Sequence, residues 1–539
     1  MLKLVPIIVL IMNMTLSFAC NSSKKDNEEV ELKNDYEDLV SLFQEFRRIQ
    51  RPKLINGAPD YTTSTMELQR RELRKLQSRL AMIDQNGWPI PQRVDYLLVL
   101  AEMNGLEFDH RILRPWARDP GFYITTYLGF GPSMQGTLRI PKLPLSADRI
   151  AEFQMKLKAV PKILEQAKGN LTEAAGDLVR LAIYAKEKES AVFQDLASDL
   201  AKHHPELVTD AERAKAACDD FHDWLKENKS RMTANAGIGI ENYDWYMKNV
   251  QLFPYSWDES LLLSQREYER ALAFLKLEEN KNRKLPQIMP VKTKEEWQHL
   301  AQMVNKQLME FLRSEEVFTV PDYLAPGEPK PYIPPGPKRR FFDKARYRDP
   351  RPLRAHNLPG HRLDGLMHQR DKHPIRGTKR LYFIDGIRAE GWATGLEEMV
   401  LQLGFLDKFP RTREITYVLL ANRAARAIAD LKMHSNEFSF EEAFQYLIEA
   451  TPYWLEKDDL AAWFDLELYL RQPGYGMGYL LGKIQLEQLL SDGAKQWGEM
   501  FSLRQFHDKF LEAGMIPISL IRWELTGLDD QIKKISNFE

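Results

Sequence analysis

The chain has 539 residues, of which 44% are hydrophobic and 28% charged, so it has ample material for a large globular core. Its formal net charge of −2 excludes the strongly basic surface with which many proteins bind nucleic acid, and we expect no nucleic-acid partner. With only two cysteines, it is not a small protein held together by disulfides.

The N-terminus has the features of an export signal. Residues 1–20 begin with Lys3, continue as an apolar run too short for a membrane span, and end at Ala19 and Cys20. The sequence Ser-Phe-Ala-Cys resembles a relaxed bacterial lipobox, whose cysteine is acylated after cleavage. We therefore predict a lipoprotein signal peptide, a flexible charged tether over 21–33, and export to the bacterial cell envelope with a lipid anchor at Cys20. An ordinary secretory peptide and an N-terminal apolar helix are the alternatives.

Helical periodicity dominates the rest of the chain and predicts a mainly α fold. We expect one large helical domain over 34–539, with only a few short strands, near 341 and 382. Cys218 lies in one of the apolar stripes, which indicates a buried small hydrophobe and not a nucleophile. Ser439 and Glu442 form a plausible capping box. The predicted helices cover 39–46, 66–83, 91–105, 147–168, 172–200, 207–229, 259–283, 294–314, 391–405, 412–434, 440–451, 459–471, 474–491, 503–513 and 517–526.

Residues 318–354 interrupt this rhythm with many prolines and a cluster of Lys and Arg. A long irregular connection in a compact protein is often functional, and this one leads directly into the sequence AHNLPGH. It could form a wall of a cleft that attracts carboxylates. A solvated loop with scattered ion pairs is the alternative.

The stretch from Ala355 to Glu398 concentrates the side chains most capable of chemistry. Histidines followed by a Glu on a later helix are the ligand types of a catalytic zinc site. On an ideal helix His356 and His361, five residues apart, point about 140° from each other, but Pro359 and Gly360 would kink that helix. The histidines and carboxylates of the stretch are His356, His361, His368, His373, Glu390, Glu397 and Glu398.

Two motifs in this stretch resemble those of a known family. AHNLPGH (355–361) is similar to HExxPGH, and EGWATGLE (390–397) is similar to EGWAxYxE. Both mark the bacterial domain of unknown function 885 family, large helical proteins grouped with zinc peptidases of the Glu-ligand type. Three later segments, at 425–434, 472–483 and 502–517, resemble further family motifs in the right order. The resemblance covers most of the chain after about residue 150.

The resemblance implies a zinc-peptidase-like architecture and a set of site residues. His361 and Glu390 match ligand positions, and His356 or His368 could supply the third ligand. His434 and Tyr479 match positions that stabilise a developing oxyanion, so the catalytic candidates are His356, His434 and Tyr479. His361, Glu390 and His434 are expected to converge in one cleft. Supporting roles fall to Glu397, Asp430 and Arg426, although a buried polar network is an alternative role for Asp430 and His434.

The centre of the first motif departs from the family pattern. Ala355 stands where the family has its first His and cannot bind a metal, and His356 stands where the family has the Glu that takes a proton from metal-bound water. We therefore expect bound zinc to be weak or absent. Three hypotheses follow: a catalytically degenerate lipoprotein that binds a peptide or protein partner, an active metal-dependent hydrolase with rearranged ligands, and a structural envelope lipoprotein.

Overall fold

The computed structural model describes residues 36–128 and 138–536. Most of these residues are helical, as the apolar periodicity of the sequence predicts. The predicted signal peptide 1–20, with Cys20, and the tether 21–33 lie outside the described residues. No helix in the described part of the chain is both long and apolar enough to span a membrane. The mainly α architecture predicted from the sequence is confirmed.

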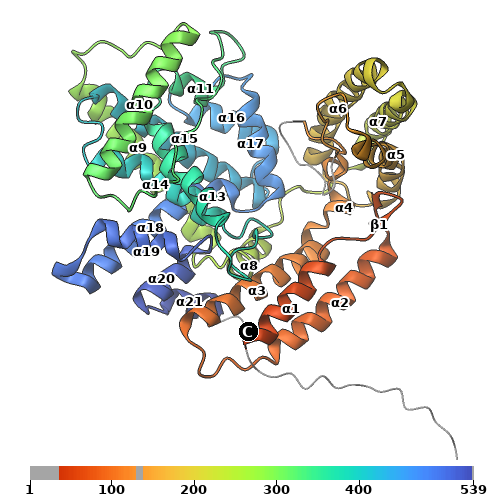
Figure 1. Ribbon diagram of the computed structural model, residues 1–539, viewed down its shortest axis with the longest axis horizontal. Coiled ribbons are helices and arrows are strands. Elements are labelled where there is room, and N and C mark those ends of the chain that lie inside the picture. Colours follow the sequence, from red (N-terminus) through yellow and green to blue (C-terminus); the bar gives the residue numbers. More distant parts are fainter. Residues whose placement is uncertain (1–35, 129–137, 537–539) are drawn as a thin grey trace, which may run out of the picture.

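The first three helices pack as a layer at one side of the molecule (Figure 1). They are α1 (Tyr36–Ile49), α2 (Thr63–Ala81) and α3 (Ile90–Phe108). Between α1 and α2 lies an antiparallel hairpin of β1 (Leu54–Ile55) and β2 (Ala58–Pro59). Its turn residues Asn56 and Gly57 both have positive φ, as a tight two-residue hairpin turn requires.

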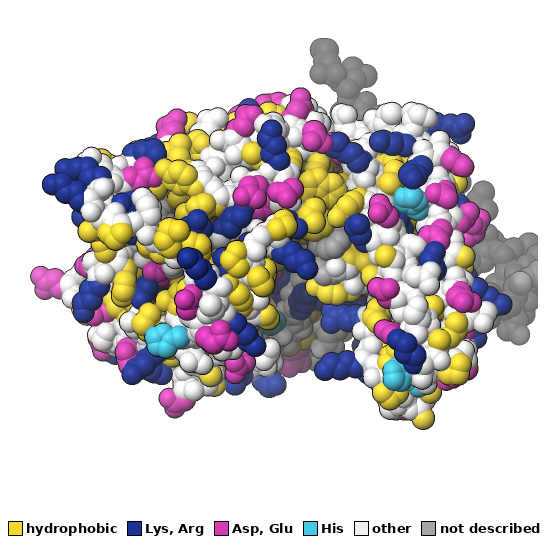
Figure 2. Space-filling view, turned by 90° about the horizontal axis from the view of Figure 1, so that it is seen from above, with side chains coloured by type: hydrophobic (Ala, Val, Ile, Leu, Met, Phe, Trp, Pro, Cys, Tyr) yellow, Lys and Arg dark blue, Asp and Glu magenta, His cyan; other side chains and the backbone are white. Residues whose placement is uncertain are grey.

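Three long helices form a smaller lobe that stands apart from the main body in Figure 1. They are α5 (Ala147–Asn170), α6 (Gly176–His203) and α7 (Val208–Asn228), reached from α3 through η1 (Asp109–Leu113), α4 (Pro115–Arg118) and η2 (Pro120–Tyr123). The short turns η3 (Pro205–Leu207) and η4 (Lys229–Arg231) flank α7. Cys218 is fully buried in this lobe, as predicted. The surface is hollowed between the lobe and the body, and Lys and Arg side chains gather around the hollow (Figure 2).

The main body is built around α14 (Gly386–Gln402) and α15 (Pro410–His434), which are buried along nearly their whole length. Helix α15 packs against α9 and α18, and α14 packs against α18. The surrounding elements are α8 (Ile240–Asn249), α9 (Trp257–Lys281), α10 (Lys294–Ser314), α11 (Phe341–Arg346), α12 (Arg351–Ala355), η5 (His356–Arg362), α13 (Leu363–His368), α16 (Phe440–Ala450), α17 (Leu460–Arg471), α18 (Tyr475–Trp497), η6 (Gly498–Met500), α19 (Leu503–Glu512), α20 (Ile518–Thr526) and α21 (Asp530–Ser536).

Local capping sets several helix starts, and in one case it corrects the sequence prediction. The capping box of Ser439 and Glu442 is confirmed at the start of α16. The strands predicted near 341 and 382 are wrong. Asp343 accepts a hydrogen bond from the Arg340 amide and initiates α11 instead. Tyr382 has a φ of +54°, which no strand can accommodate.

Candidate metal centre

A π-helical turn brings the two histidines of the first motif together. In η5 the backbone is wound more widely than an α-helix, Pro359 lacks an N–H, and Gly360 leaves helical geometry altogether (φ −79°, ψ −107°). Residues five apart therefore face the same side. The 140° separation of an ideal helix does not apply to His356 and His361.

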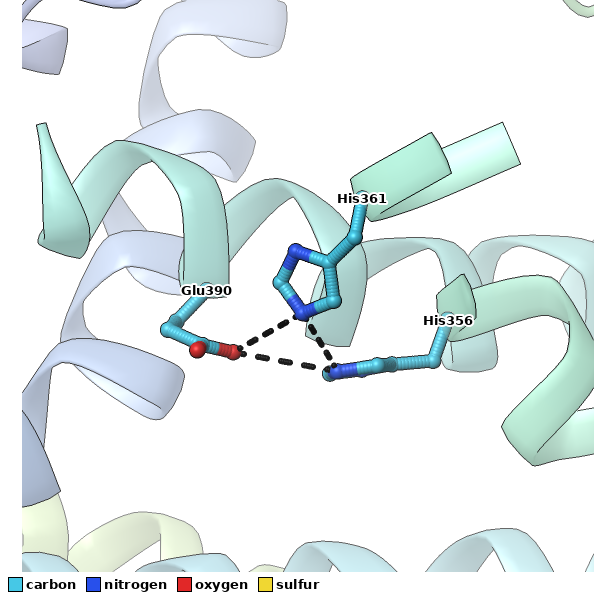
Figure 3. A group of neighbouring side chains, drawn as sticks. All are labelled: His356, His361 and Glu390. Carbon is cyan, nitrogen blue, oxygen red and sulfur yellow. Dashed lines mark hydrogen bonds and ion pairs between the residues drawn. The ribbon is translucent and has the colours of Figure 1, made fainter. Parts of the chain in front are cut away.

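Three side-chain atoms form a small triangle at this turn (Figure 3). Nε2 of His361 lies 3.0 Å from Nε2 of His356 and 3.3 Å from Oε2 of Glu390, and the third side measures 3.7 Å. A tetrahedral zinc ion with bonds of about 2.0 Å keeps its ligand atoms about 3.3 Å apart. In addition, Oε2 of Glu390 is buried without a hydrogen-bond partner among the described residues. His356, His361 and Glu390 therefore fit zinc and would leave its fourth position open.

Glycines place Glu390 in the triangle. Glu390 is followed by Gly391 on α14, and a Cβ at Gly391 would lie 2.4 Å from the backbone of Gly482 on α18. A Cβ at Gly482 would lie 2.1 Å from the carbonyl oxygen of Ile387. The two helices cross so closely only because both positions lack a side chain.

A buried carboxylate lies behind His356. Its Nδ1 is 2.9 Å from Oε1 of Glu397, which also accepts a hydrogen bond of 2.6 Å from Arg423. Burial raises the pKa of Glu397 to about 7, although the Arg423 charge opposes this. Burial, reinforced by Arg423, lowers the pKa of His356 far below its ordinary value, so this ring is neutral. A carboxylate at Nδ1 favours the proton on that nitrogen and leaves the lone pair of Nε2 facing the triangle.

Tyr475 contacts Glu390 on the other side of the site. Its hydroxyl donates to Oε1 of Glu390 (3.1 Å), and its ring stacks on Phe383 with 4.4 Å between centroids. Burial alone would raise the pKa of Glu390, but the close contact and the charge of His361 outweigh it and lower that pKa. His361 is the open side of the triangle: its side chain is 37% exposed, against 10% for His356.

Arg426 and Tyr479 lie next to this centre. The guanidinium of Arg426 donates to the hydroxyl of Tyr479 (3.4 Å) and pairs with Asp465 (3.2 Å). Its charge also lies 4.7 Å from the centre of the Tyr479 ring. Burial and the charge of Glu390 raise the pKa of Tyr479, so its hydroxyl remains a hydrogen-bond donor at neutral pH.

His434 does not join the triangle, so the predicted convergence is wrong for His434, whereas His361 and Glu390 do lie together. His434 ends α15 eleven residues after Arg423, about 16 Å farther along the helix. There its Nε2 lies 3.0 Å from the carbonyl oxygen of Tyr469, and Asp430 accepts a hydrogen bond from the Met477 amide at the start of α18. Burial lowers the pKa of His434 to about 4 and raises that of Asp430 to about 8. Both residues belong to the buried polar network that was the alternative.

The remaining candidates of the 355–398 stretch point elsewhere. His368 ends α13 outside the triangle, His373 lies 3.5 Å from Asp95, and Glu398 is bound by Arg270 and Lys483. Arg423 and Tyr475 are site residues that no sequence motif indicated. A charged residue amid the apolar run of the predicted helix 412–434 was the available signal for Arg423.

Known proteins share this architecture. A proposed lipoprotein of unknown function from Shewanella oneidensis superposes with a TM-score of 0.69 over 90% of this chain and 99% of its own, at 16% identity. A second, from Colwellia psychrerythraea, has a TM-score of 0.65 over 91% of this chain and 98% of its own, also at 16% identity. No curated protein matches the chain. The family model described as "Bacterial protein of unknown function (DUF885)" matches residues 55–525, and the chain therefore belongs to this family.

Proposed function

We propose that this protein is a bacterial envelope lipoprotein with a zinc-peptidase-like fold, whose His356, His361 and Glu390 bind a zinc ion and whose site holds a peptide or protein partner without efficient turnover. The observation that carries the proposal is the triangle of ligand atoms, with the unsatisfied oxygen of Glu390. This geometry supports firmer zinc binding than the two family positions alone would provide. Export and lipidation are supported by Ala19 and Cys20 and by the two structural neighbours described as proposed lipoproteins.

Loss of catalysis follows from how the carboxylates are used. Bound zinc would supply a Lewis acid, but peptide hydrolysis also needs a base beside the zinc-bound water. Among the described residues, the carboxylates that contact the two histidines are Glu390, a ligand itself, and Glu397, which Arg423 holds on the far side of His356. His356 cannot act as both ligand and base.

The surroundings suit a carbonyl or carboxylate group. The open side at His361 would let a ligand reach a zinc ion held by the triangle, and the donors of Arg426 and Tyr479 lie nearby. A peptide carbonyl or a C-terminal carboxylate could be bound by these groups together. This supports a peptide or protein ligand as the partner.

An active hydrolase is the second candidate. Three protein ligands with an open fourth position are the usual arrangement of catalytic zinc, whereas structural zinc has four protein ligands. Under this alternative, Tyr479 or Arg426 would stabilise the developing oxyanion.

The test is metal analysis of the protein purified without a His tag. We expect about one zinc per chain in the wild type, and little in His361→Ala and Glu390→Gln. His373→Ala, which removes a histidine outside the triangle, is the matched control. A wild type that takes up no zinc even when it is supplied would refute the metal site and favour a purely structural lipoprotein.

Two further measurements separate the remaining alternatives. Incubation with a broad peptide library should give no cleavage, and chelator-sensitive cleavage would instead establish the active hydrolase. Replacing Cys20 with Ser should release the protein from membranes. A wild type that fractionates as a soluble protein with Met1 intact would contradict the envelope assignment.

A further inference from the structure

A cavity away from the metal centre lies where the smaller lobe meets the main body. It has a volume of about 180 Å³ and is walled by apolar side chains from three separate parts of the chain. Leu113 and Phe122 come from η1 and η2, Leu178 from α6, and Leu470 from α17. This volume holds several water molecules, so the cavity suits a ligand of one or two residues.

Two opposite charges face this cavity, and neither forms an ion pair with a described residue. Asp109, the first residue of the π-helical turn η1, makes no ion pair or hydrogen bond through its carboxylate with any described residue. Burial raises its pKa to about 7. Arg118 donates to two carbonyl oxygens, of Ile112 (3.0 Å) and Asn235 (2.6 Å), but pairs with no carboxylate in the described part of the chain.

The other charges around the cavity are already neutralised. Arg471 donates to Asp119 at 2.5 Å and 3.1 Å and to Glu467 at 2.6 Å. This clamp joins η2 to α17 and explains how the cavity walls are held together. Asp109 and Arg118 differ from these residues: both line the same small space, and no ion pair joins them to each other or to another described residue.

Unpaired charges in a partly buried cavity are costly unless a ligand compensates them. A carboxylate attracts an ammonium group, a guanidinium binds a carboxylate, and the apolar walls favour an apolar side chain. We propose that this cavity, the Asp109–Arg118 pocket, binds a zwitterion with an apolar side chain, either a free amino acid or a dipeptide. The ammonium group pairs with Asp109 and the carboxylate with Arg118.

The pocket is separate from the metal centre, and hydrogen bonds of Gln472 and Tyr475 connect the two. Gln472 lines the pocket, its carbonyl accepts from the amide of Tyr475 (3.1 Å), and Tyr475 in turn donates to Glu390. None of the groups that recognise the zwitterion is a zinc ligand. The inference goes beyond the proposed function and predicts binding whether or not zinc is present.

Calorimetric titration of the full protein, with zinc and after chelation, tests the proposal. The probes are L-leucine, the dipeptide Leu-Gly, leucinamide, which lacks the carboxylate, and N-acetyl-leucine, which lacks the ammonium group. We expect L-leucine or Leu-Gly to bind the wild type at least about tenfold more tightly than either blocked probe, because each blocked probe loses one charge-assisted contact. The tighter of the two unblocked probes identifies the source of the ligand.

Variants assign each charge to its partner. Asp109→Asn should weaken L-leucine and leucinamide about tenfold and leave N-acetyl-leucine unchanged, whereas Arg118→Gln should weaken L-leucine and N-acetyl-leucine and leave leucinamide unchanged. The exposed Glu212→Gln and Arg149→Gln serve as controls and should bind as the wild type does. No binding of any probe at about 10 mM, or equal binding of blocked and unblocked probes, would overturn the proposal without relying on any variant. Loss of all binding on chelation would also overturn it, since the probe would then be sitting on the metal.

Discussion

Nδ1 of His356 lies 2.9 Å from Oε1 of Glu397, while Nε2 of the same ring lies 3.0 Å from Nε2 of His361. One nitrogen thus faces a carboxylate and the other faces the candidate metal position. A carboxylate behind a histidine is a common support for metal-binding histidines, because it fixes the ring and raises its basicity. This relationship supports the proposal that His356 is a ligand, although the family motif has a base at that position.

Removing this support should weaken zinc binding without removing a ligand. Glu397→Gln keeps the size of the side chain but loses the charge that holds the proton on Nδ1. We expect zinc affinity, measured by competition with a chromogenic chelator, to fall about 10- to 100-fold. Glu437→Gln, on the exposed loop after α15, should leave it unchanged. Equal affinity in Glu397→Gln and the wild type would mean that the contact does not orient His356.

The spacing of α14 and α18 gives the second prediction. In Gly391→Ala the new methyl group would meet the backbone of Gly482 at 2.4 Å, so the helices must move apart and carry Glu390 away from His361. We expect a loss of about 1–3 kcal/mol in the free energy of unfolding, together with lower zinc content. Thermal unfolding and metal analysis measure the two effects.

Gly395→Ala is the matched control one turn later on α14. Its methyl group would meet only the end of the Leu486 side chain, at 3.1 Å, which can rotate away. Because alanine also favours the helix, stability should change by less than about 1 kcal/mol in either direction. Equal stability and zinc content in Gly391→Ala and Gly395→Ala would show that the close helix crossing is unimportant.

The ion cluster of Glu398 should stabilise the fold in a pH-dependent way. Burial would raise the pKa of Glu398, but its hydrogen bonds with Arg270 and the charge of Lys483 lower it to about 2. Since the pKa in the unfolded chain is higher, this stabilisation is fully present above about pH 4.5 and is lost as the pH falls toward 2. Glu398→Gln should therefore cost about 3–5 kcal/mol at pH 7 and progressively less in acid, as measured by urea unfolding.

Glu487 provides the comparison for this cluster. It contacts the same Lys483 at 2.6 Å, but its side chain is 54% exposed. Solvent screens such a pair, so Glu487→Gln should cost less than about 1 kcal/mol at any pH. A loss in Glu398→Gln that stays constant from pH 7 to pH 3 would contradict the electrostatic account.

Regular helices were predictable from the sequence because each one buries a stripe at helical spacing. The predicted range 294–314 coincides with α10, and the capping box of Ser439 is present. The absence of strands near 341 and 382 was not predictable from apolar content alone. In α11 the outcome depends on Asp343, one polar side chain that caps the helix.

The metal centre was predictable in composition but not in geometry. The two motifs identify His361 and Glu390, yet the role of His356 depends on a π turn that helical periodicity cannot express. Arg423 and Tyr475 join the site through contacts with residues 26 and 85 positions away in the chain. His434 was misplaced because the order of the motifs in the sequence does not show where along α15 the metal centre lies.

The family motif can be rebuilt by combining Ala355→His with His356→Glu, and the structure predicts that this will not restore a working site. Ala355 is fully buried in the hydrophobic core, so a histidine there overpacks it at a cost of about 1–3 kcal/mol. A glutamate at position 356 would place a third negative charge beside Glu397 and Glu390, which repel it. Arg423, which contacts the His356 ring in the wild type, would be the nearby cation that offsets this repulsion.

We therefore expect the double variant to unfold at a lower temperature than the wild type, to contain less zinc and to cleave no peptides. His356→Gln, which removes the ligand but keeps a neutral side chain, separates the two effects: it should lose zinc and unfold near the temperature of the metal-free wild type. Thermal unfolding, metal analysis and the peptide library applied to all three proteins provide the measurement. A double variant that folds, fills with zinc and hydrolyses peptides would instead mean that the two introduced side chains fit the existing surroundings. Unchanged zinc content in His356→Gln would mean that His356 is not the ligand the triangle indicates.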